Sequence, residues 1–283
     1  MQLRQSERKQ AKIKLAIQGS SGSGKTYSAL LLAYGLINDW NKIAIIDTEN
    51  GSADLYAHLG SYQVLSLKPP YSPERYVQAI ETCVKSGIEC IIIDSISHCW
   101  EFLLEYHSSL AGNSFANWAI VGKRQNRFVD AILQCQAHII ATMRTKQDYV
   151  LNQKDGKYIP EKVGLKSVQR DGLDYEFTIV FDIDSKHFTK ASKDRTGLFT
   201  DKPEFIVTSN TGKEILDWCN SGIGLKEVKA MIESSTSMED LIAIYKKYPT
   251  WYNLLEKEYS LKKQLLQVNQ NIESSKILQN GTL

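Results

Sequence analysis

The residues with the clearest chemical signature form one short run, Gly19-Ser20-Ser21-Gly22-Ser23-Gly24-Lys25-Thr26, which fits the phosphate-binding pattern G-x-x-x-x-G-K-[ST]. Its glycines allow backbone turns that a Cβ would penalise, and they let main-chain N–H groups close around phosphate oxygens. The Lys25 ammonium is able to reach the β- and γ-phosphates, and the Thr26 hydroxyl is a ligand for Mg²⁺. The run therefore predicts a site for ATP and Mg²⁺.

The elements around this run favour a phosphate site over a Gly/Ser-rich turn that binds nothing, which is the alternative interpretation. Residues 13–17 form an apolar run typical of a strand that leads into the loop. Residues 26–36 form an apolar helix that leads out of it, and the N-terminus of a helix stabilises a bound anion. The order strand, loop and helix is the context in which this pattern binds phosphate.

Two carboxylates follow predicted buried strands and are candidates for the chemistry of hydrolysis. Asp94 ends the run Cys90-Ile91-Ile92-Ile93, and an aspartate at such a strand end orients Mg²⁺. Glu49 follows the run 42–47 and is the best candidate for the group that positions water, because Ser95 stands where one large class carries this carboxylate. The ends of parallel strands meet at one sheet edge, so we expect Glu49 and Asp94 to face one nucleotide. The alternative for Glu49 is a charge at a helix N-terminus or on the surface.

Composition limits the class of protein more than it identifies one. The chain has 283 residues, of which 42% are hydrophobic and 23% are charged, as in an ordinary globular protein. Its net charge of +2 gives no indication of a polyanion partner. The five cysteines lack C-x-x-C pairing and indicate reduced core thiols in a cytosolic protein. The histidines show no metal-ligand spacing, and His98 and His138 are expected to pack or form hydrogen bonds. No apolar run is long enough to span a bilayer, so no membrane partner is expected.

The order of predicted strands and helices indicates an α/β fold with a mostly parallel sheet flanked by helices. Further strands are expected at 62–67, 138–142, 175–182 and 205–207, and helices at 73–85, 99–110, 117–136 and 212–219. Ser221–Gly224 is the best linker candidate. The expected domains are a basic arm at 1–12, the ATPase domain at 13–219, a helical domain at 225–270 and a flexible tail at 271–283. The arm is either solvated or in contact with DNA or a neighbouring subunit.

The segment from Arg144 to Arg170 is polar and combines cations with tyrosines, a composition that suits single-stranded nucleic acid. Cations follow phosphates and aromatic rings stack on bases. Acidic residues dilute this pattern, and an ordinary solvated hairpin is the alternative. The candidate contacts to DNA are Lys146, Lys154, Lys157, Lys162, Lys166 and Arg170.

A resemblance joins these motifs. The segment from Ile45 to Tyr56, which contains I-D-T-E, is similar to the RecA segment that runs from a catalytic glutamate to a tyrosine beside adenine. With Gly19–Thr26 and Ile91–Ser95 it resembles the RecA-like recombinase ATPases. The whole order, with a proline-rich turn, I-I-D-S and H-I-I-A-T-x-R, is similar to the phage-encoded single-strand annealing ATPases of the Sak-four type. The resemblance covers about residues 10–218 and is specific in the first 150.

The resemblance implies roles for individual residues. Lys25, Glu49 and Asp94 would form the catalytic set, with Glu49 positioning water. Tyr56 would lie near adenine, with core packing as its alternative. Thr142 or Arg144 would sense the γ-phosphate, although family members use a glutamine near there. Lys193 and Arg195 are candidates for a cation donated across a subunit boundary, with a solvated turn as the alternative.

The function expected from these observations is ATP-dependent binding of single-stranded DNA by a homo-oligomer, a ring or a filament, in recombination by strand annealing or exchange. The setting would be the cytoplasm of a bacterial host, for a phage or mobile-element protein, and a single-strand-binding protein is a further candidate partner. Two alternatives stay open: a P-loop kinase or other small-molecule phosphotransferase with residues 145–195 as its lid, and a non-hydrolysing, nucleotide-gated recombination mediator.

Overall fold

The computed structural model describes residues 10–154 and 157–280. At 147–154, 157–165, 249–250, 253 and 269–280 it describes the backbone without the side chains. The chain separates into two compact units, of which the larger is Lys12–Cys219 and the smaller contains the residues from Asn220 onward. The larger unit carries the phosphate-binding run and all the predicted catalytic residues. The two units are described separately.

The larger unit is built on a sheet with the strand order β3-β2-β4-β5-β1-β7-β8. All neighbouring pairs from β3 to β7 are parallel, and β8 joins β7 antiparallel. A further strand, β6, pairs antiparallel with β5 alone. The strands are β1 (Lys14–Gly19), β2 (Ile43–Asp47), β3 (Gln63–Ser66), β4 (Cys90–Asp94), β5 (His138–Lys154), β6 (Lys157–Ser167), β7 (Ile179–Ile183) and β8 (Thr189–Asp194).

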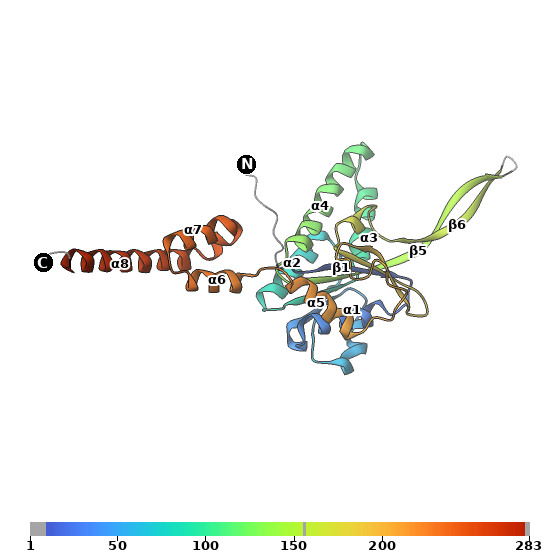
Figure 1. Ribbon diagram of the computed structural model, residues 1–283. Helices are drawn as coiled ribbons and strands as arrows, with labels where there is room; N and C mark the ends of the chain where they lie inside the picture. The colour runs from blue at the N-terminus through green and yellow to red at the C-terminus, as the bar shows by residue number, and fades with distance from the viewer. Residues whose placement is uncertain (1–9, 155–156, 281–283) are drawn as a thin grey trace. The chain divides into compact units, whose positions relative to one another are not determined.

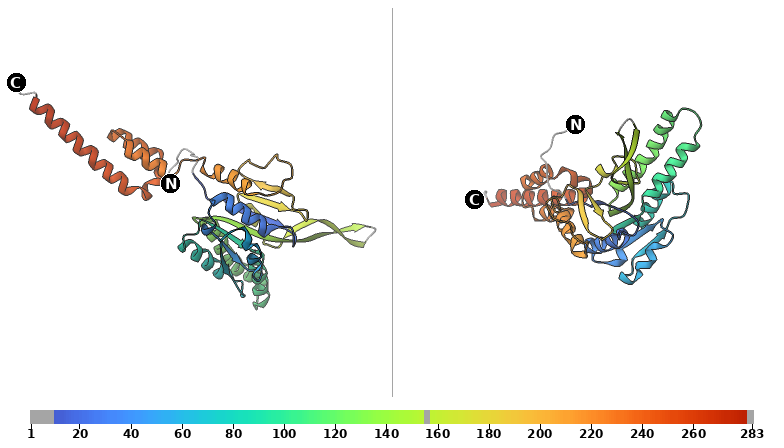
Figure 2. Two further views of the ribbon diagram at one scale, coloured as in Figure 1. Left: turned by 90° about the horizontal axis from the view of Figure 1, so that it is seen from below. Right: turned by 90° about the vertical axis from the view of Figure 1, so that its right-hand side faces the viewer.

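Helices cover both faces of this sheet (Figure 2), and the central strands are apolar throughout because both faces are buried. In β4, Ile91 and Ile93 pack into the core beneath α2 and α4, while Cys90 and Ile92 pack into the core beneath α1 and α5. The helices are α1 (Lys25–Ile37), α2 (Pro73–Lys85), α3 (Ser97–Ser109), α4 (Ser114–Gln134) and α5 (Ser209–Asn220), with 3₁₀ helices η1 (Trp40–Lys42), η2 (Ser52–Leu59) and η3 (Leu173–Tyr175). The expected α/β fold with a mostly parallel sheet is confirmed.

The register of the sheet brings the ends of β1, β2 and β4 to one edge, where β5 passes beside them. Asp47 at the end of β2 pairs with Asp94 at the end of β4. Gly19 at the end of β1 pairs with Arg144 on β5. The residues that follow these strands therefore share one edge of the sheet, as expected for parallel strands that carry a ligand site.

Strand β5 continues beyond the sheet. Its first residues lie between β4 and β1, and from Thr145 onward it pairs only with β6, as a long two-stranded hairpin that extends away from the sheet (Figure 1). From the sequence, a strand is expected only to Thr142, with a polar segment after it. The continuation of the strand escapes prediction because the sequence from Thr145 to Lys154 lacks the regular alternation of apolar and polar residues that marks a half-buried strand.

Two expected strands differ in the structure. The strand expected at 175–182 begins at Ile179, because η3 and a turn occupy the residues before it. Phe205 forms an isolated bridge to Thr189 in place of the strand expected at 205–207. The ring of Phe205 packs against Phe181 and Phe199, so this apolar residue contributes to the core without being part of a regular strand.

The smaller unit contains α6 (Leu225–Ser234), α7 (Met238–Lys247), the 3₁₀ helix η4 (Pro249–Leu254) and α8 (Glu256–Asn280). Ser237 and Asp240 form a capping box at the start of α7, with the Asp240 N–H donating to Ser237 Oγ over 3.0 Å. Helix α8 runs to Asn280, past the expected boundary near residue 270, because its sequence has no glycine or proline before Gly281. Within the described ranges, no helix has the length and apolar character needed to cross a membrane.

Candidate active site

The phosphate-binding run forms a loop between β1 and α1, as its pattern predicts. Gly22 and Gly24 have φ of 78° and 88°, a left-handed backbone that glycine adopts without strain. A Cβ on Gly19 would come within 2.5 Å of the Ile183 carbonyl oxygen, so this position also requires glycine. The first N–H groups of α1 have no partner inside the helix and are available to an anion. The buried hydroxyl of Ser23 is also without a hydrogen-bond partner among the described residues.

Lys25, the first residue of α1, folds back over the loop. Its Nζ donates to the carbonyl oxygens of Gly19 over 3.1 Å and Ser20 over 2.8 Å. Burial lowers the pKa of Lys25, although the charges of Asp94 and Glu49 oppose this effect. The ammonium is thus held inside the loop, where a phosphate would stabilise the charge that burial disfavours.

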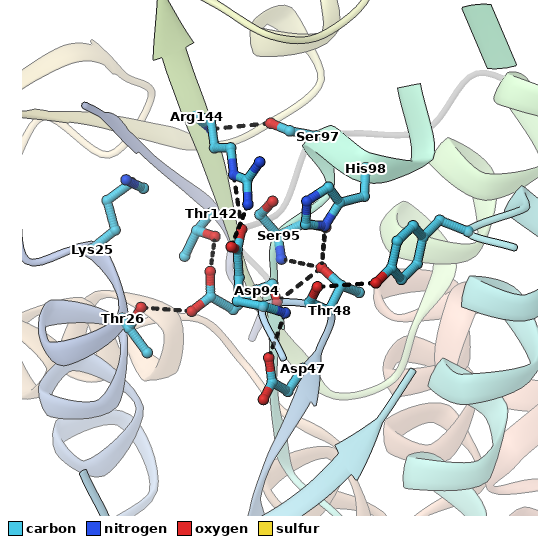
Figure 3. A network of polar contacts seen from close by, with 12 residues as sticks. Lys25, Thr26, Asp47, Thr48, Asp94, Ser95, Ser97, His98, Thr142 and Arg144 are labelled. Carbon is cyan, nitrogen blue, oxygen red and sulfur yellow. Dashed lines mark hydrogen bonds and ion pairs between the residues drawn. The ribbon is translucent and has the colours of Figure 1, made fainter. Parts of the chain in front are cut away.

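Asp94 is held by two hydroxyls, one from each side of the site (Figure 3). Thr26 Oγ1 donates to Asp94 Oδ2 over 2.6 Å, and Thr142 Oγ1 donates to Oδ1 over 2.5 Å. The carboxylate is almost fully buried, and burial raises the pKa of Asp94 despite these two hydrogen bonds. Thr142, expected as a γ-phosphate sensor, therefore lies against the predicted metal residue and fixes its orientation.

Glu49 lies just beyond β2 and faces Arg144 on β5. Arg144 Nε donates to Glu49 Oε1 over 2.9 Å, and Nη2 donates to Oε2, so the pair is bidentate. Burial favours the protonated acid, yet the hydrogen bonds and charge of Arg144 hold the pKa of Glu49 below its usual value. Both carboxylate oxygens are engaged by the guanidinium. Glu49 is ionised and beside Asp94, but it is restrained.

A buried threonine connects the ends of β2 and β4 behind these carboxylates (Figure 3). Thr48 Oγ1 accepts from the Ser95 N–H over 2.9 Å and lies 2.7 Å from His98 Nδ1. The Thr48 N–H donates to the Asp94 carbonyl over 2.8 Å. The ring of Tyr71 stacks on His98 with 4.9 Å between centroids, so His98 packs and forms hydrogen bonds as expected. The role of Thr48 was not predicted, and its position inside I-D-T-E was the available signal.

A cavity of about 440 Å³ opens beside the phosphate loop. Tyr56 lines it, where the resemblance expects a contact with adenine, and the ring of Tyr27 lies 5.9 Å from that of Tyr56. Three further lining residues carried no sequence signal: His187, Ile206 and Val207. His187 Nδ1 lies 2.9 Å from the Ser23 carbonyl oxygen, so the β7–β8 turn forms a wall of this cavity.

The candidate subunit-bridging cations are bonded within their own chain. Lys193 Nζ donates to the carbonyl oxygens of Asp174 over 2.9 Å and of Tyr175. Arg195 Nη2 donates to the same Tyr175 carbonyl over 2.9 Å. Either side chain would have to leave these contacts to reach a neighbouring subunit.

The candidate DNA contacts all map to the β5–β6 hairpin and its return to the core. Lys146 and Lys166 are exposed, and Lys166 lies 2.9 Å from Asp171. Arg170 is exposed and donates from Nη1 to Asn126 Oδ1 over 3.2 Å. The side chains of Lys154, Lys157 and Lys162 lie outside the part of the structure that is described.

The groups available to a metal ion are few. Among the described residues, no cluster of three or more His, Cys, Asp or Glu side chains has the geometry of a metal site. The hydroxyl of Thr26 and the carboxylate of Asp94 nevertheless lie together beside the phosphate loop. Mg²⁺ prefers one or two protein oxygens together with water and substrate phosphates, so this donor set fits it.

Comparison with known proteins agrees with this geometry. A family model described as an AAA domain matches residues 11–211, which includes the phosphate loop, every candidate catalytic residue and the hairpin. No curated protein matches the chain. Since the family match covers most of the chain, this protein belongs to the AAA domain family, and its larger unit is a nucleotide-binding P-loop NTPase domain of the AAA type.

Proposed function

We propose that this protein is an ATPase that binds single-stranded DNA and acts as an oligomer in recombination by strand annealing or exchange. One observation carries the proposal. Strand β5 places Thr142 and Arg144 in the nucleotide site and continues without a break into the basic hairpin. A ligand on the hairpin would therefore act on the same strand that holds Asp94 and Glu49.

The residues of the site fit the parts that ATP hydrolysis requires. The loop N–H groups and Lys25 would bind the phosphates, and Thr26 with Asp94 would hold Mg²⁺, which offsets negative charge on the phosphates. Glu49, ionised beside this site, would orient the attacking water. Tyr56 and Tyr27 would contact the base in the adjoining cavity.

The pair of Glu49 and Arg144 would link hydrolysis to DNA. While the guanidinium engages both oxygens of Glu49, the carboxylate is poorly placed to accept a hydrogen bond from water. A shift of β5 caused by DNA on the hairpin would open the pair. Arg144 would then be free to meet the γ-phosphate, the role that the resemblance implies for a residue here.

The register of the hairpin supports an anionic ligand. Lys146 lies directly opposite Lys166, and Lys154 lies directly opposite Lys157. Like charges on directly opposed positions destabilise an antiparallel pair. Phosphates along the hairpin would neutralise Lys146, Lys154 and Lys157 and would compete with Asp171 for Lys166. The kinase alternative would instead require this β-ribbon to act as a closing lid.

Titration of the protein with fluorescent single-stranded DNA tests the proposal. Charge reversal at Lys146 and Lys166 should weaken the binding of DNA. In a plot of the logarithm of the DNA association constant against the logarithm of the salt concentration, the slope should become smaller in magnitude by about one for each phosphate that the variant no longer neutralises. Lys85→Glu is the matched control, because its side chain is 80% exposed on α2, away from the hairpin. Failure of the wild-type protein to bind DNA with or without ATP would refute the proposal.

A further inference from the structure

A second, smaller cavity lies between α4 and the segment where the hairpin returns to the core. Its volume is about 260 Å³. Pockets for drug-sized ligands usually begin near 300 Å³, so this one suits a fragment the size of a single nucleobase. This smaller cavity shares no lining residue with the cavity beside the phosphate loop.

The lining has the character that a nucleobase requires. Val129 and the buried Leu173 supply apolar surface for the face of a ring. Around them stand two amides, a guanidinium and two carboxylates: Gln125, Asn126, Arg170, Asp171 and Glu176. A base combines flat apolar faces with an edge of donors and acceptors, and proteins bind unstacked bases through both.

Gln125 is the observation that points to a ligand. Its side chain is 1% exposed, and neither its amide nitrogen nor its amide oxygen has a hydrogen-bond partner among the described residues. A buried amide without partners is costly, and such groups are rare unless they have a role. A glutamine amide presents one donor and one acceptor side by side, the arrangement that pairs with a base edge.

The position of the cavity connects it to the hairpin and to the nucleotide site. Arg170, in its wall, lies just beyond the end of β6. In the same return segment, the Val168 N–H donates to the Arg144 carbonyl over 2.8 Å, and Gln169 Nε2 donates to the Ile96 carbonyl over 2.6 Å. A strand of DNA that follows the hairpin to its base would reach this cavity next.

We infer that this cavity is a subsite for one unstacked base of single-stranded DNA, read by the Gln125 amide, and that it prefers bases with an exocyclic amino group. The inference rests on the proposed function. The preference follows from Glu176, whose carboxylate would accept a hydrogen bond from the amino group of cytosine or adenine while the Gln125 amide holds the base edge in place. Uracil and thymine present a carbonyl oxygen at the same position and would face this carboxylate unfavourably.

Oligo(dC) and oligo(dU) provide the matched pair of probes, since they differ mainly in this amino group. Wild-type protein should bind oligo(dC) about tenfold more tightly than oligo(dU), the size expected for one bidentate amide–base pair. Gln125→Met removes the amide with little change in side-chain length. It should abolish the preference and leave the affinity for oligo(dU) unchanged. Gln134→Met, on the exposed end of the same helix, should keep the preference.

Unfolding by denaturant without DNA gives a second readout. Gln125→Met should unfold at a higher denaturant concentration than wild type, because it removes an unpaired buried amide. Gln125→Leu repeats the test if methionine perturbs the fold. Equal wild-type affinity for the two oligonucleotides, or a preference retained in both Gln125 variants, would overturn the subsite and leave DNA binding intact. Failure to bind either oligonucleotide would overturn both proposals.

Discussion

Arg144→Met is the most informative single perturbation of the nucleotide site. In the structure, Arg144 is bonded to both oxygens of Glu49, with side-chain exposures of 40% for Arg144 and 23% for Glu49. At this exposure the solvent screens the pair, so its opening costs only about 1 kcal/mol. If the pair restrains Glu49 in the absence of DNA, its removal should raise DNA-free ATP turnover by about fivefold. Because the variant also lacks the Arg144 contact to the γ-phosphate, DNA should stimulate it less than it stimulates the wild type.

The same substitution should change the pH dependence of turnover. Arg144 holds the pKa of Glu49 below its usual value against the opposing effect of burial. Without Arg144, burial would raise the pKa of Glu49, so the carboxylate would become protonated at a higher pH. Turnover, which requires the ionised acid, should then begin to fall at a higher pH than in wild type.

Steady-state phosphate release with and without single-stranded DNA, measured across a pH series, is the assay. Arg124→Met is the control, because Arg124 forms an equivalent bidentate pair with Glu74 outside the nucleotide site. Arg144→Lys keeps the charge but loses the fork geometry, so its turnover should fall between those of wild type and Arg144→Met. A decrease in DNA-free turnover with unchanged ATP affinity would refute the restraint and leave Arg144 as a direct contact to the nucleotide.

Three further predictions concern the cavity, a buried histidine and a helix contact. Tyr56→Ala should weaken ATP binding by about three- to tenfold through loss of stacking, whereas Leu55→Ala, at a side chain 74% exposed, should not, as measured with a fluorescent nucleotide. Burial lowers the pKa of His138 from 6.5 to about 3, so on acidification the unfolded state binds this proton before the folded state does. The free energy of unfolding should therefore fall as the pH drops from 6.5 towards 3. Denaturant unfolding across this pH range should show a smaller decline for His138→Asn than for the wild type. Gly35→Ala should destabilise the domain by about 1–3 kcal/mol, because its Cβ would come within 2.8 Å of Gly212 Cα on α5; a denaturation midpoint equal to wild type would contradict this close approach.

The parts of the fold that were predictable are those encoded by local signals. The phosphate loop follows from glycine and lysine spacing between a strand and a helix. Helix α2 has the predicted bounds, because Pro73 fixes its first turn and Gly87 follows its end. Asp94 and Glu49 were placed at one sheet edge by the general rule for parallel strands, and the register brings their strand ends together.

The parts that were not predictable depend on contacts between distant segments. The cavity beside the phosphate loop is also lined by His187 from the β7–β8 turn and by Ile206 and Val207 before α5, and no motif marks these residues. The pairing of Arg144 with Glu49 depends on the register between β1 and β5, which places Arg144 opposite Gly19. The composition of the two strands does not determine this register. The unpaired amide of Gln125 is likewise visible only once α4 is packed.

The most direct test of the central claim is ATP turnover with and without single-stranded DNA for wild type, Lys25→Ala and Glu49→Gln. We expect DNA to stimulate the wild type and both variants to lose turnover. Glu49→Gln should still bind ATP, because it removes only the group that orients water, whereas Lys25→Ala should bind it poorly. Wild-type turnover that DNA leaves unchanged, or a Glu49→Gln variant that hydrolyses ATP normally, would contradict the claim.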